Sequence, residues 1–430
     1  MHIPLMLYMM KESIFNSKKF ITDEVVAIYN SYNDKTLFVS KNKIKFEDLL
    51  MSDSLILKNL IDNGFVVSDD CDEVGNYLNY IRASECDMSV AHLIINPTIN
   101  CNFNCWYCYE NHIKSLMSED IIERLKSLIA NIFAEKRLLQ ISFFGGEPML
   151  CYKNVILPLL EKTKHLSEQL GGEYFVNMTT NGYLFNEKRI EKLKEYNFNG
   201  VQITLDGYKD IHDKIRKPVN GSGSYDRIVS NIFNLLEYGI PVTVRINCTK
   251  DNIDTMVSVA KSFVCLDRAS KKILNFDFQI VWQEENKEII SHKMNKIVQK
   301  FVKVGLNASK MSFRDFCYAD KRNSCVINYN GDLYKCTAVD FLSTKRDGYL
   351  SENGDLIWEN NSLEERMASK LKNKPCLSCR ILPLCHGGCT KHSLNAVGDY
   401  CIYNFNEEEK DEVVLDAIEH NIHFSKVTRL

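Results

Sequence analysis

The sequence predicts an α/β fold in which six strands alternate with helices and form a parallel sheet, closed into a partial (β/α)6 TIM barrel. Two observations support this prediction. Between residues 91 and 305, short apolar runs alternate with longer amphipathic runs. Cysteines gather at 101–108, directly after the first of these runs, and again at 317–401. Because parallel barrels place their chemistry at the carboxyl ends of the strands, the first cysteine group predicts a site there.

The alternation gives expected positions for each element. We expect strands at Leu93–Asn96, Gln140–Phe144, Tyr174–Met178, Val201–Leu205, Val242–Asn247 and Phe276–Val281. Between them, helical patterns lie at Ser118–Glu135, Lys153–Gln169, Asn186–Tyr196, Tyr225–Tyr238 and Asn252–Phe263. Ser118 is a good N-cap residue, and Asp120 suits the first turn of the helix that follows it.

The flanking regions differ from the barrel. Residues 1–90 predict a small winged-helix-like domain: a hairpin at Glu24–Ser40, a helix at Phe46–Asn63 and a short strand at Phe65–Val67. The opening apolar run, residues 1–10, is expected to be a buried strand, because it lacks the basic start and cleavage site of a signal peptide. We expect the barrel at 91–305, a cysteine-rich domain at 306–405, and a last segment at 406–430 with a helix at Glu407–Ile422.

Composition limits the possible partners and the location. The chain has 430 residues, a formal net charge of -3 and 45% hydrophobic residues. A near-neutral balance disfavours nucleic acid and anionic membranes as partners, and no apolar run reaches the length of about 18 residues needed to cross a bilayer. Sixteen cysteines without an export signal suggest metal ligands in a reducing compartment rather than disulfides. We therefore expect a cytoplasmic protein.

The first cysteine group has the pattern Cys101-x3-Cys105-x2-Cys108. Three thiolates leave one metal position open, which favours chemistry over a closed structural site, although a zinc site has the same ligands. With Tyr107 before its last cysteine, the pattern resembles the signature of radical S-adenosylmethionine enzymes. The resemblance implies an open-site [4Fe–4S] cluster whose fourth iron binds S-adenosylmethionine, and a 5′-deoxyadenosyl radical that abstracts hydrogen.

Further motifs extend this resemblance and imply contacts to the cosubstrate. Gly145-Gly146-Glu147-Pro148 resembles the GGEP turn that receives the cosubstrate's ammonium, and Thr180 and Asn181 lie in a similar TNG turn. In the run 203–216, Thr204 matches a residue that hydrogen-bonds the ribose or carboxylate, and Arg216 one that pairs with the carboxylate. Arg245 is a further candidate for a polar contact, with a plain salt bridge as the alternative. For Asp206 and His212, a structural role in the turn is equally compatible.

The second cysteine group resembles the SPASM extension of radical enzymes that modify peptides. The resemblance implies two auxiliary [4Fe–4S] clusters with four thiolates each, and hence three clusters in total. One set of ligands would be Cys317, Cys325, Cys336 and Cys389, and the other Cys376, Cys379, Cys385 and Cys401. Zinc knuckles are the alternative for this segment. The remaining five cysteines are expected to be buried or incidental thiols.

The function implied is maturation of a ribosomally made precursor peptide, by formation of a thioether or carbon–carbon cross-link or by oxidation of a residue. Such an enzyme needs an external electron donor such as flavodoxin or ferredoxin. Residues 1–90 either bind the leader of the precursor by strand addition or pack against the barrel.

Two other functions stay open. One is anaerobic sulfatase maturation, which makes formylglycine. Against it, the triplet begins only at Cys101, and Cys336 is followed by Thr337 instead of an acidic base, with Asp340 out of register. We therefore assign no catalytic base. The other is a non-catalytic iron–sulfur carrier or zinc scaffold.

Overall fold

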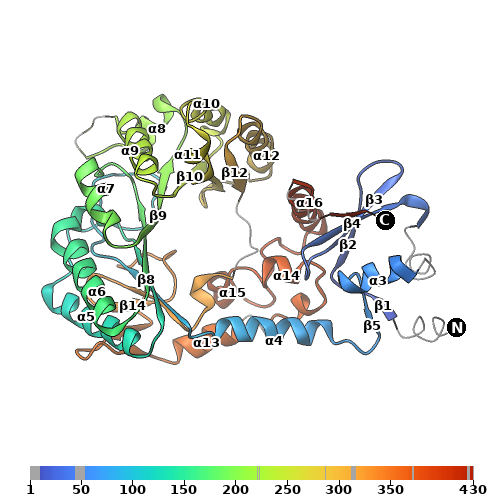
Figure 1. Cartoon of the computed structure of the whole chain (residues 1–430), viewed down its shortest axis with the longest axis horizontal. Coiled ribbons are helices and arrows are strands. Elements are labelled where there is room, and N and C mark those ends of the chain that lie inside the picture. Colours follow the sequence, from blue (N-terminus) through green and yellow to red (C-terminus); the bar gives the residue numbers. More distant parts are fainter. Residues whose placement is uncertain are drawn as a thin grey trace. The chain divides into compact units, whose positions relative to one another are not determined.

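The protein, in this computed structural model, forms two compact units (Figure 1). The barrel unit contains residues 87–312 and 321–363, and the terminal unit contains residues 1–86, 313–320 and 364–430. The structure describes residues 10–43, 54–219, 221, 223–285, 287–310, 316–369, 372–423 and 427–429. The strand expected at residues 1–10 lies outside these ranges except for Met10, and so do residues 46–53 of the expected first helix.

The parallel sheet of the barrel unit confirms the predicted fold class. The six expected strands are β6 (Val90–Ile95), β7 (Leu138–Phe143), β8 (Tyr174–Thr180), β9 (Phe198–Leu205), β10 (Val242–Cys248) and β11 (Leu274–Ile280). They pair in parallel in chain order, as successive right-handed βαβ units do. Two strands that were not predicted, β12 (Asn307–Lys310) and β13 (Ser324–Ile327), add in parallel at the two ends of this run.

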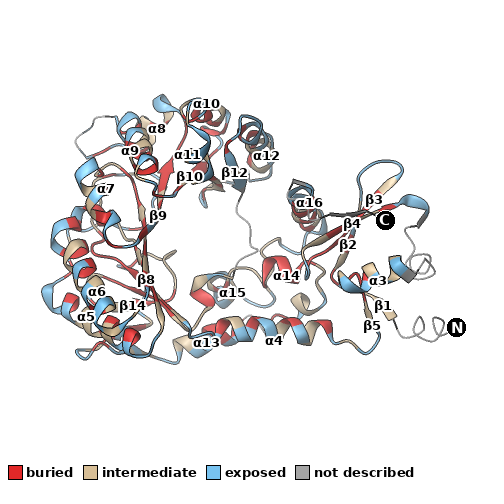
Figure 2. Cartoon of the chain, in the orientation of Figure 1, coloured by how far each residue is buried: buried red, intermediate tan, exposed pale blue. Residues whose placement is uncertain are grey.

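Helices cover one face of this sheet (Figure 1). The predicted helices are α5 (Glu119–Ala134), α6 (Leu157–Leu170) after a π-helical turn at Tyr152–Ile156, α7 (Glu187–Lys194), α9 (Tyr225–Glu237) and α10 (Met256–Lys261). The helices α8 (Lys209–Ile215), α11 (Arg268–Lys272) and α12 (Lys287–Lys303) were not predicted. The Ser118 hydroxyl caps α5 by accepting from Ile121 N at 3.4 Å. Figure 2 shows the helices buried toward the sheet and exposed outside.

The opposite face of the sheet is polar and half-buried. Along β10, Val244 and Ile246 are fully buried in the core under the helices, whereas Arg245 between them is only partly buried. The alternation follows from the pleat, which turns successive side chains to opposite faces. Thr204, Arg245 and Asp277 stand side by side on β9, β10 and β11. Thr204 and Arg245 on this face lie near the carboxyl ends of β9 and β10.

An antiparallel extension continues the sheet beyond β13. It consists of β14 (Asp332–Tyr334), β15 (Gly348–Leu350) and β16 (Leu356–Trp358), each paired with the strand before it. Leu333 and Leu350 of this cysteine-rich region join the main core, so residues 324–358 belong to the barrel unit.

The terminal unit is built on a small mixed sheet with the strand order β17–β4–β3–β2. The predicted hairpin is confirmed as β3 (Val25–Asn30) and β4 (Lys35–Ser40), and it is joined by β2 (Asn16–Phe20) and β17 (Val427–Arg429). A separate pair links β1 (Met10–Glu12) with β5 (Val66–Ser68). Other elements are a 3₁₀ turn at Lys41–Lys43, α3 (Ser54–Asp62), α4 (Glu73–Glu85), α14 (Leu382–Cys385), α15 (Thr390–Asn395) and α16 (Glu407–His423), with α13 (Ser362–Ser369) at the border.

The predicted last helix, confirmed as α16, packs on the N-terminal sheet. Val414, Ala417 and Ile418 of α16 contact Ala27 and Tyr29 of β3 in one buried cluster. On the other face of the sheet, Val26 and Ile28 pack with residues of α3 and β5. The hairpin, helix and strand order expected for residues 1–90 is therefore present, and the last helix of the chain completes its core. The division into four functional domains stays a prediction.

Candidate functional site

The loop between β6 and α5 carries the first three cysteines. Cys101 and Cys105 are half-buried, and Cys108 is exposed. The loop is held by a hydrogen bond from Cys108 N to Cys105 O at 3.0 Å and by a short bridge between Phe103 and Pro218. Burial raises the pKa of the Cys101 thiol to about 12, and it also raises those of Cys105 and Cys108. Without a cation the loop thus favours neutral thiols, so metal binding must release protons.

The turn after β7 lies directly against this loop. A Cβ atom on Gly146 would come within 2.3 Å of Asn100 O and 2.6 Å of Ile99 O, and one on Gly145 within 2.3 Å of Thr98 O. Gly146 N donates to Thr98 O at 3.2 Å, and Glu147 N donates to Asn100 O at 2.9 Å. Side chains at these two positions would push the turn away from the segment that leads into Cys101.

Glu147 is fully buried and joins two turns. Its carboxylate accepts from Met149 N at 3.0 Å, from the Thr180 hydroxyl at 2.7 Å and from Asn181 N at 2.8 Å. Burial raises the pKa of this carboxyl group, although the hydrogen bonds oppose the shift. The Asn181 amide in turn donates to Asn102 Oδ1 in the cysteine loop at 2.8 Å. The structure thus brings the GGEP turn, the TNG turn and the cysteine loop together, and the ammonium contact stays a prediction.

A buried polar network lies on the other side of the loop. The Tyr107 hydroxyl donates to Asp206 Oδ2, and it accepts from Arg216 Nη1 at 2.7 Å and from Asn247 Nδ2 at 3.1 Å. Arg216 Nη1 also lies 3.6 Å from Asp206 Oδ2. Asp206 has no solvent exposure and Arg216 has 8%. Burial raises the pKa of Tyr107 well above its ordinary value, so the phenol is a neutral donor here.

Two atoms of this network have no hydrogen-bond partner within the described part of the chain. They are Asp206 Oδ1 and Arg216 Nε, and both are buried. Buried polar groups are nearly always paired, so orphaned atoms of opposite polarity beside three thiols indicate a place for a ligand that carries both kinds of group. An amino acid moiety, with an ammonium and a carboxylate, has this character.

The ends of β9 and β10 hold the network in position. His212, which is buried, accepts from Asp206 N at 3.2 Å, and its other ring nitrogen contacts the Ser224 hydroxyl at 3.0 Å. Burial lowers the pKa of His212 well below its usual value. Asn252 donates to Asp206 O at 3.2 Å and to Asn247 O at 2.8 Å. The structural role weighed for His212 therefore fits, while Asp206 enters the network directly.

Thr204 and Arg245 lie next to each other on β9 and β10, at the polar face of the sheet. Arg245 Nε donates to Asn247 Oδ1 at 2.9 Å, so Arg245 joins the Tyr107 network through Asn247. Sequence reasoning missed Asn247 and Asn252. Asn247 could have been found from the sequence, because it lies near the end of the apolar run that forms β10 and a polar side chain there needs a hydrogen-bond partner.

Two further segments of the barrel unit contact the cysteine loop. After β11, the Trp282 ring stacks on Tyr109 with 5.1 Å between centroids, and Gln283 Nε2 donates to Tyr107 O at 2.7 Å. After β14, the Asp340 carboxylate accepts from Asn111 Nδ2 at 2.7 Å. Burial raises the pKa of Asp340, but hydrogen bonds from Ser343 and Asn111 outweigh it and lower the pKa overall. Asp340 is thus a carboxylate that accepts a hydrogen bond from Asn111 of the cysteine loop.

The second cysteine group is divided between the two units. Cys317 and the five cysteines from Cys376 to Cys401 belong to the terminal unit, whereas Cys325 and Cys336 belong to the barrel unit. Cys325 is fully buried in the main apolar core, unlike Cys317, which is exposed. The predicted ligand set of Cys317, Cys325, Cys336 and Cys389 is neither confirmed nor contradicted, and it stays a prediction.

The other predicted set is brought together within the terminal unit. Burial raises the pKa of Cys385 to about 12, and the thiols of Cys379, Cys376 and Cys401 raise it further. In the described residues no three histidine, cysteine or acidic side chains are spaced to hold a single metal ion. These four thiols stay the predicted ligand set of an auxiliary cluster, with zinc as the alternative.

Comparisons with known proteins agree with this geometry. Residues 95–263 match the family model described as the Radical SAM superfamily. The chain is 28% identical over 345 residues to the cysteine-type anaerobic sulfatase-maturating enzyme of Clostridium novyi, covering 71% of this chain and 88% of that relative.

Solved structures share the fold. One, named "Native anSMEcpe with bound AdoMet and Kp18Cys peptide", has a TM-score of 0.62 at 20% identity and covers 78% of this chain and 99% of its own. Another, Streptococcus suis SuiB bound to precursor peptide SuiA, has a TM-score of 0.55 at 16% identity and covers 93% of this chain and 100% of its own. No helix in the described ranges is both long enough and apolar enough to cross a membrane.

Proposed function

From the premise that this chain carries a radical S-adenosylmethionine domain at residues 95–263, we propose that it is an enzyme that modifies a peptide by abstracting hydrogen from it. The observation that supports this proposal best is the convergence of three thiols, the double-glycine turn and the Tyr107 network at the carboxyl ends of one parallel sheet. When bound, the [4Fe–4S] cluster and S-adenosylmethionine implied by this domain supply a 5′-deoxyadenosyl radical.

Each part of the site has a separate task in this proposal. Cys101, Cys105 and Cys108 would hold the [4Fe–4S] cluster. The orphaned Asp206 Oδ1 and Arg216 Nε, together with Thr204 and Glu147, bind and orient the amino acid moiety of the cosubstrate. Arg216 offers the carboxylate a charge-assisted contact. Five further residues would shape the turns and the strand face that surround the bound cosubstrate: Gly145, Gly146, Thr180, Asn181 and Arg245.

A peptide substrate is supported by the two fold relatives whose structures contain a bound peptide. The product would be a thioether or carbon–carbon cross-link, or an oxidised residue. A flavodoxin or ferredoxin would supply the electron. Two auxiliary clusters, on the cysteines of 317–401, would accept the electron left after the product radical is oxidised. Residues 1–90 would bind the leader of the precursor, and the protein would act in the cytoplasm.

Sulfatase maturation is a second candidate, and the Clostridium novyi relative favours it. The discriminating experiment uses the Kp18Cys peptide named in the solved structure as a probe. Anaerobic incubation of that peptide with reduced protein and S-adenosylmethionine would give formylglycine if the chain is a sulfatase-type enzyme. A peptide left unmodified, while 5′-deoxyadenosine still forms, would favour a dedicated precursor encoded elsewhere.

The enzyme proposal itself is tested by cluster loading and cosubstrate cleavage. Anaerobic protein should contain roughly twelve irons if all three four-iron clusters load, and it should release 5′-deoxyadenosine after reduction. Cys105→Ala should abolish this release. The matched control is Cys265→Ala, because Cys265 is an exposed thiol outside both cysteine groups. Zinc in place of iron would refute the proposal and favour the scaffold alternative.

A further inference from the structure

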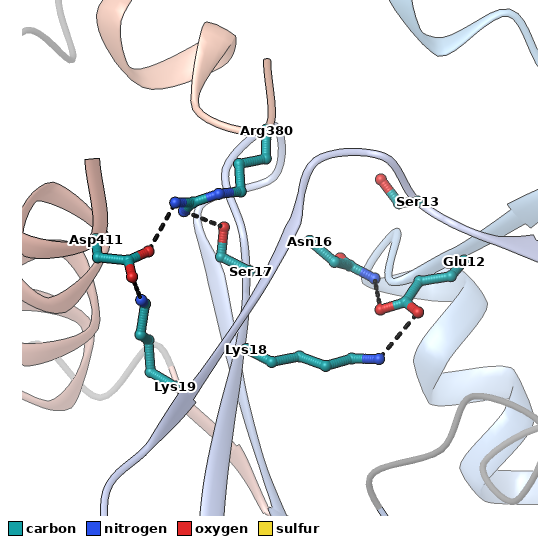
Figure 3. Close-up of a pocket in the computed structure, with 8 residues that line it drawn as sticks. All are labelled: Glu12, Ser13, Asn16, Ser17, Lys18, Lys19, Arg380 and Asp411. Carbon is teal, nitrogen blue, oxygen red and sulfur yellow. Dashed lines mark hydrogen bonds and ion pairs between the residues drawn. The ribbon is translucent and has the colours of Figure 1, made fainter. Parts of the chain in front are cut away.

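Two cavities of the protein differ in the charge of the residues that line them. The larger, of about 560 Å³, lies in the terminal unit and is lined by polar residues of both signs (Figure 3). Lys18 pairs there with Glu12 at 3.0 Å. Asp411 pairs with Lys19 and, at 2.7 Å, with Arg380. Because these charges are already paired, the larger cavity offers an ionic ligand little to bind.

The second cavity, of about 330 Å³, lies in the barrel unit and lacks this balance. The residues that line it are Arg268, Lys271, Lys272, Gly305 and Asn307. Three of them are basic and none is acidic. Within the described part of the chain, none of the three basic residues forms an ion pair. The cavity therefore carries an excess of positive charge, although the chain as a whole has a net charge of -3.

Hydrogen bonds fix the wall of the second cavity. Asn307, the first residue of β12, donates from Nδ2 to Lys271 O at 2.9 Å and to Leu274 O at 3.3 Å. These bonds join the end of α11 to the starts of β11 and β12. Lys271 Nζ donates to Val264 O at 2.8 Å. A Cβ atom on Gly305 would meet no atom within 4 Å, so the space beside this residue is open.

A basic stripe on α12 ends beside the same cavity. Lys296, Lys300 and Lys303 are exposed, and their spacing of four and three residues places them along one face of the helix. Lys303 lies two residues before Gly305 of the cavity wall. Like charges at this spacing repel one another and lower the stability of the helix. A bound anion would offset this repulsion.

Helix ends explain only part of this charge. The helix dipole favours cations in a last turn, and four of the lysines lie in the last turns of α11 and α12: Lys271, Lys272, Lys300 and Lys303. Arg268, however, is the first residue of α11, where the dipole favours an acidic side chain. The position of Arg268 therefore needs another explanation, and a negatively charged ligand supplies one.

We propose that the second cavity binds a small polyanion through phosphoryl oxygens, either inorganic diphosphate or the diphosphate end of a nucleotide. The planar fork of Arg268 can hold two oxygens of one phosphoryl group, and Lys272 adds a point charge. A volume of about 330 Å³ lies at the lower end of the range of about 300 to 1,000 Å³ that small-ligand sites have. The ligand is therefore a small molecule rather than a protein surface.

This site is separate from the site of the cosubstrate. Leu274 and Asn307 begin β11 and β12, so the cavity lies at the amino ends of these strands, whereas the cysteine loop follows the carboxyl end of β6. In parallel barrels the amino ends of the strands serve stability rather than chemistry. The polyanion thus binds without taking part in the reaction, whether or not the chain is a radical enzyme.

Isothermal titration calorimetry of the full chain with sodium diphosphate, in buffer free of phosphate and divalent cations, tests the site. Arg268→Gln should weaken binding about tenfold, because it removes a charge-assisted contact. Arg268→Lys should recover only part of this loss, since lysine keeps the charge but not the fork. Lys272→Gln should weaken binding severalfold. The matched control is Lys188→Gln in α7, an exposed lysine outside the cavity and the stripe, which should leave the dissociation constant unchanged.

Two companion probes identify the source of the phosphoryl groups. Adenosine diphosphate bound more tightly than inorganic diphosphate would identify a nucleotide, and equal dissociation constants would identify free diphosphate. Citrate, which carries its charge on three separate carboxylates, should bind more weakly than diphosphate. Binding of citrate as tight as that of diphosphate would overturn the assignment to phosphoryl groups.

Hydrogen exchange locates the bound anion and checks the fold of each variant. The amides of Asn307, Ala308 and Ser309 in β12 should exchange more slowly when diphosphate is bound, while those of β7 stay unchanged. Arg268 and Lys272 are exposed, so their variants should keep the exchange pattern of the unliganded protein. The full chain failing to bind millimolar diphosphate, or binding it no more tightly than Arg268→Gln and Lys272→Gln do, would overturn the proposal.

Discussion

Asp206 holds the centre of the network beside the cysteine loop, and its replacement by asparagine isolates its charge. The side chain has no solvent exposure and lies 3.6 Å from the guanidinium of Arg216, itself 8% exposed. Asparagine keeps the volume and can still accept from the Tyr107 hydroxyl. The substitution therefore removes one charge of a buried pair and little else.

The expected cost follows from the Arg216 charge that is left behind. Breaking a buried ion pair by removing one partner costs about 3 to 5 kcal/mol, because the remaining charge is uncompensated. We take the lower end, about 3 kcal/mol, since the Tyr107 hydroxyl still accepts from Arg216 Nη1. At about 2 °C per kcal/mol for a unit of this size, the unfolding midpoint of the barrel unit should fall by about 6 °C.

The assay is thermal unfolding of the protein without cluster, followed by circular dichroism at neutral pH. The matched control is Asp210→Asn, four residues further on in α8, where the carboxylate is exposed. Its midpoint should change by no more than about 1 °C, as surface substitutions do. An unfolding midpoint for Asp206→Asn equal to that of the control would show that Asp206 is protonated in the folded state. Asp206 and Arg216 would then not form an ion pair.

Three further predictions concern the turn, the cluster and acid stability. Gly146→Ala should lower iron incorporation severalfold, because its Cβ would meet Asn100 O at 2.3 Å, whereas Gly200→Ala in β9, whose Cβ would lie 3.2 Å from the side-chain oxygen of Asn177 and whose φ is not left-handed, should load normally. Cys105→Ala should release no 5′-deoxyadenosine while the Cys265→Ala control retains it; release by both would reject the ligand role. Burial lowers the pKa of His92 to about 4 from 6.5, so the folded state binds fewer protons than the unfolded chain between these values. Stability present above pH 6.5 should therefore fall as the pH drops toward 4, by up to about 3 kcal/mol, and His92→Gln should flatten this profile in urea titrations.

The six central strands could be predicted because each is a short apolar run between longer amphipathic runs, and this signal is local. β12 to β16 could not be predicted in the same way. Each of these strands has only three or four residues, and its place in the sheet depends on neighbours such as β6, far away in the sequence. α12 was not predicted, because it follows the last expected strand and the alternation of strands and helices was not extended beyond that strand.

In the candidate site, too, the parts that form local motifs could be predicted, and the parts that join distant positions could not. The cysteine triplet and the GGEP turn are local motifs, and the structure brings them together through the close approach at Gly145 and Gly146. The network joins Tyr107 to Asp206 and Asn247, which lie 99 and 140 residues further along the chain, so no spacing rule in a single sequence reveals it. The ligand role of Cys325 stays a prediction from its spacing, and its burial in the apolar core was not visible from the sequence.

The central claim is an iron site with a vacancy that S-adenosylmethionine fills. Electron paramagnetic resonance of the reduced protein, prepared without oxygen, tests it most directly when a variant with only the Cys101, Cys105 and Cys108 group intact is used. The account predicts a [4Fe–4S] signal that changes shape when S-adenosylmethionine is added. A signal that stays the same on addition, or no four-iron signal at all, would contradict it.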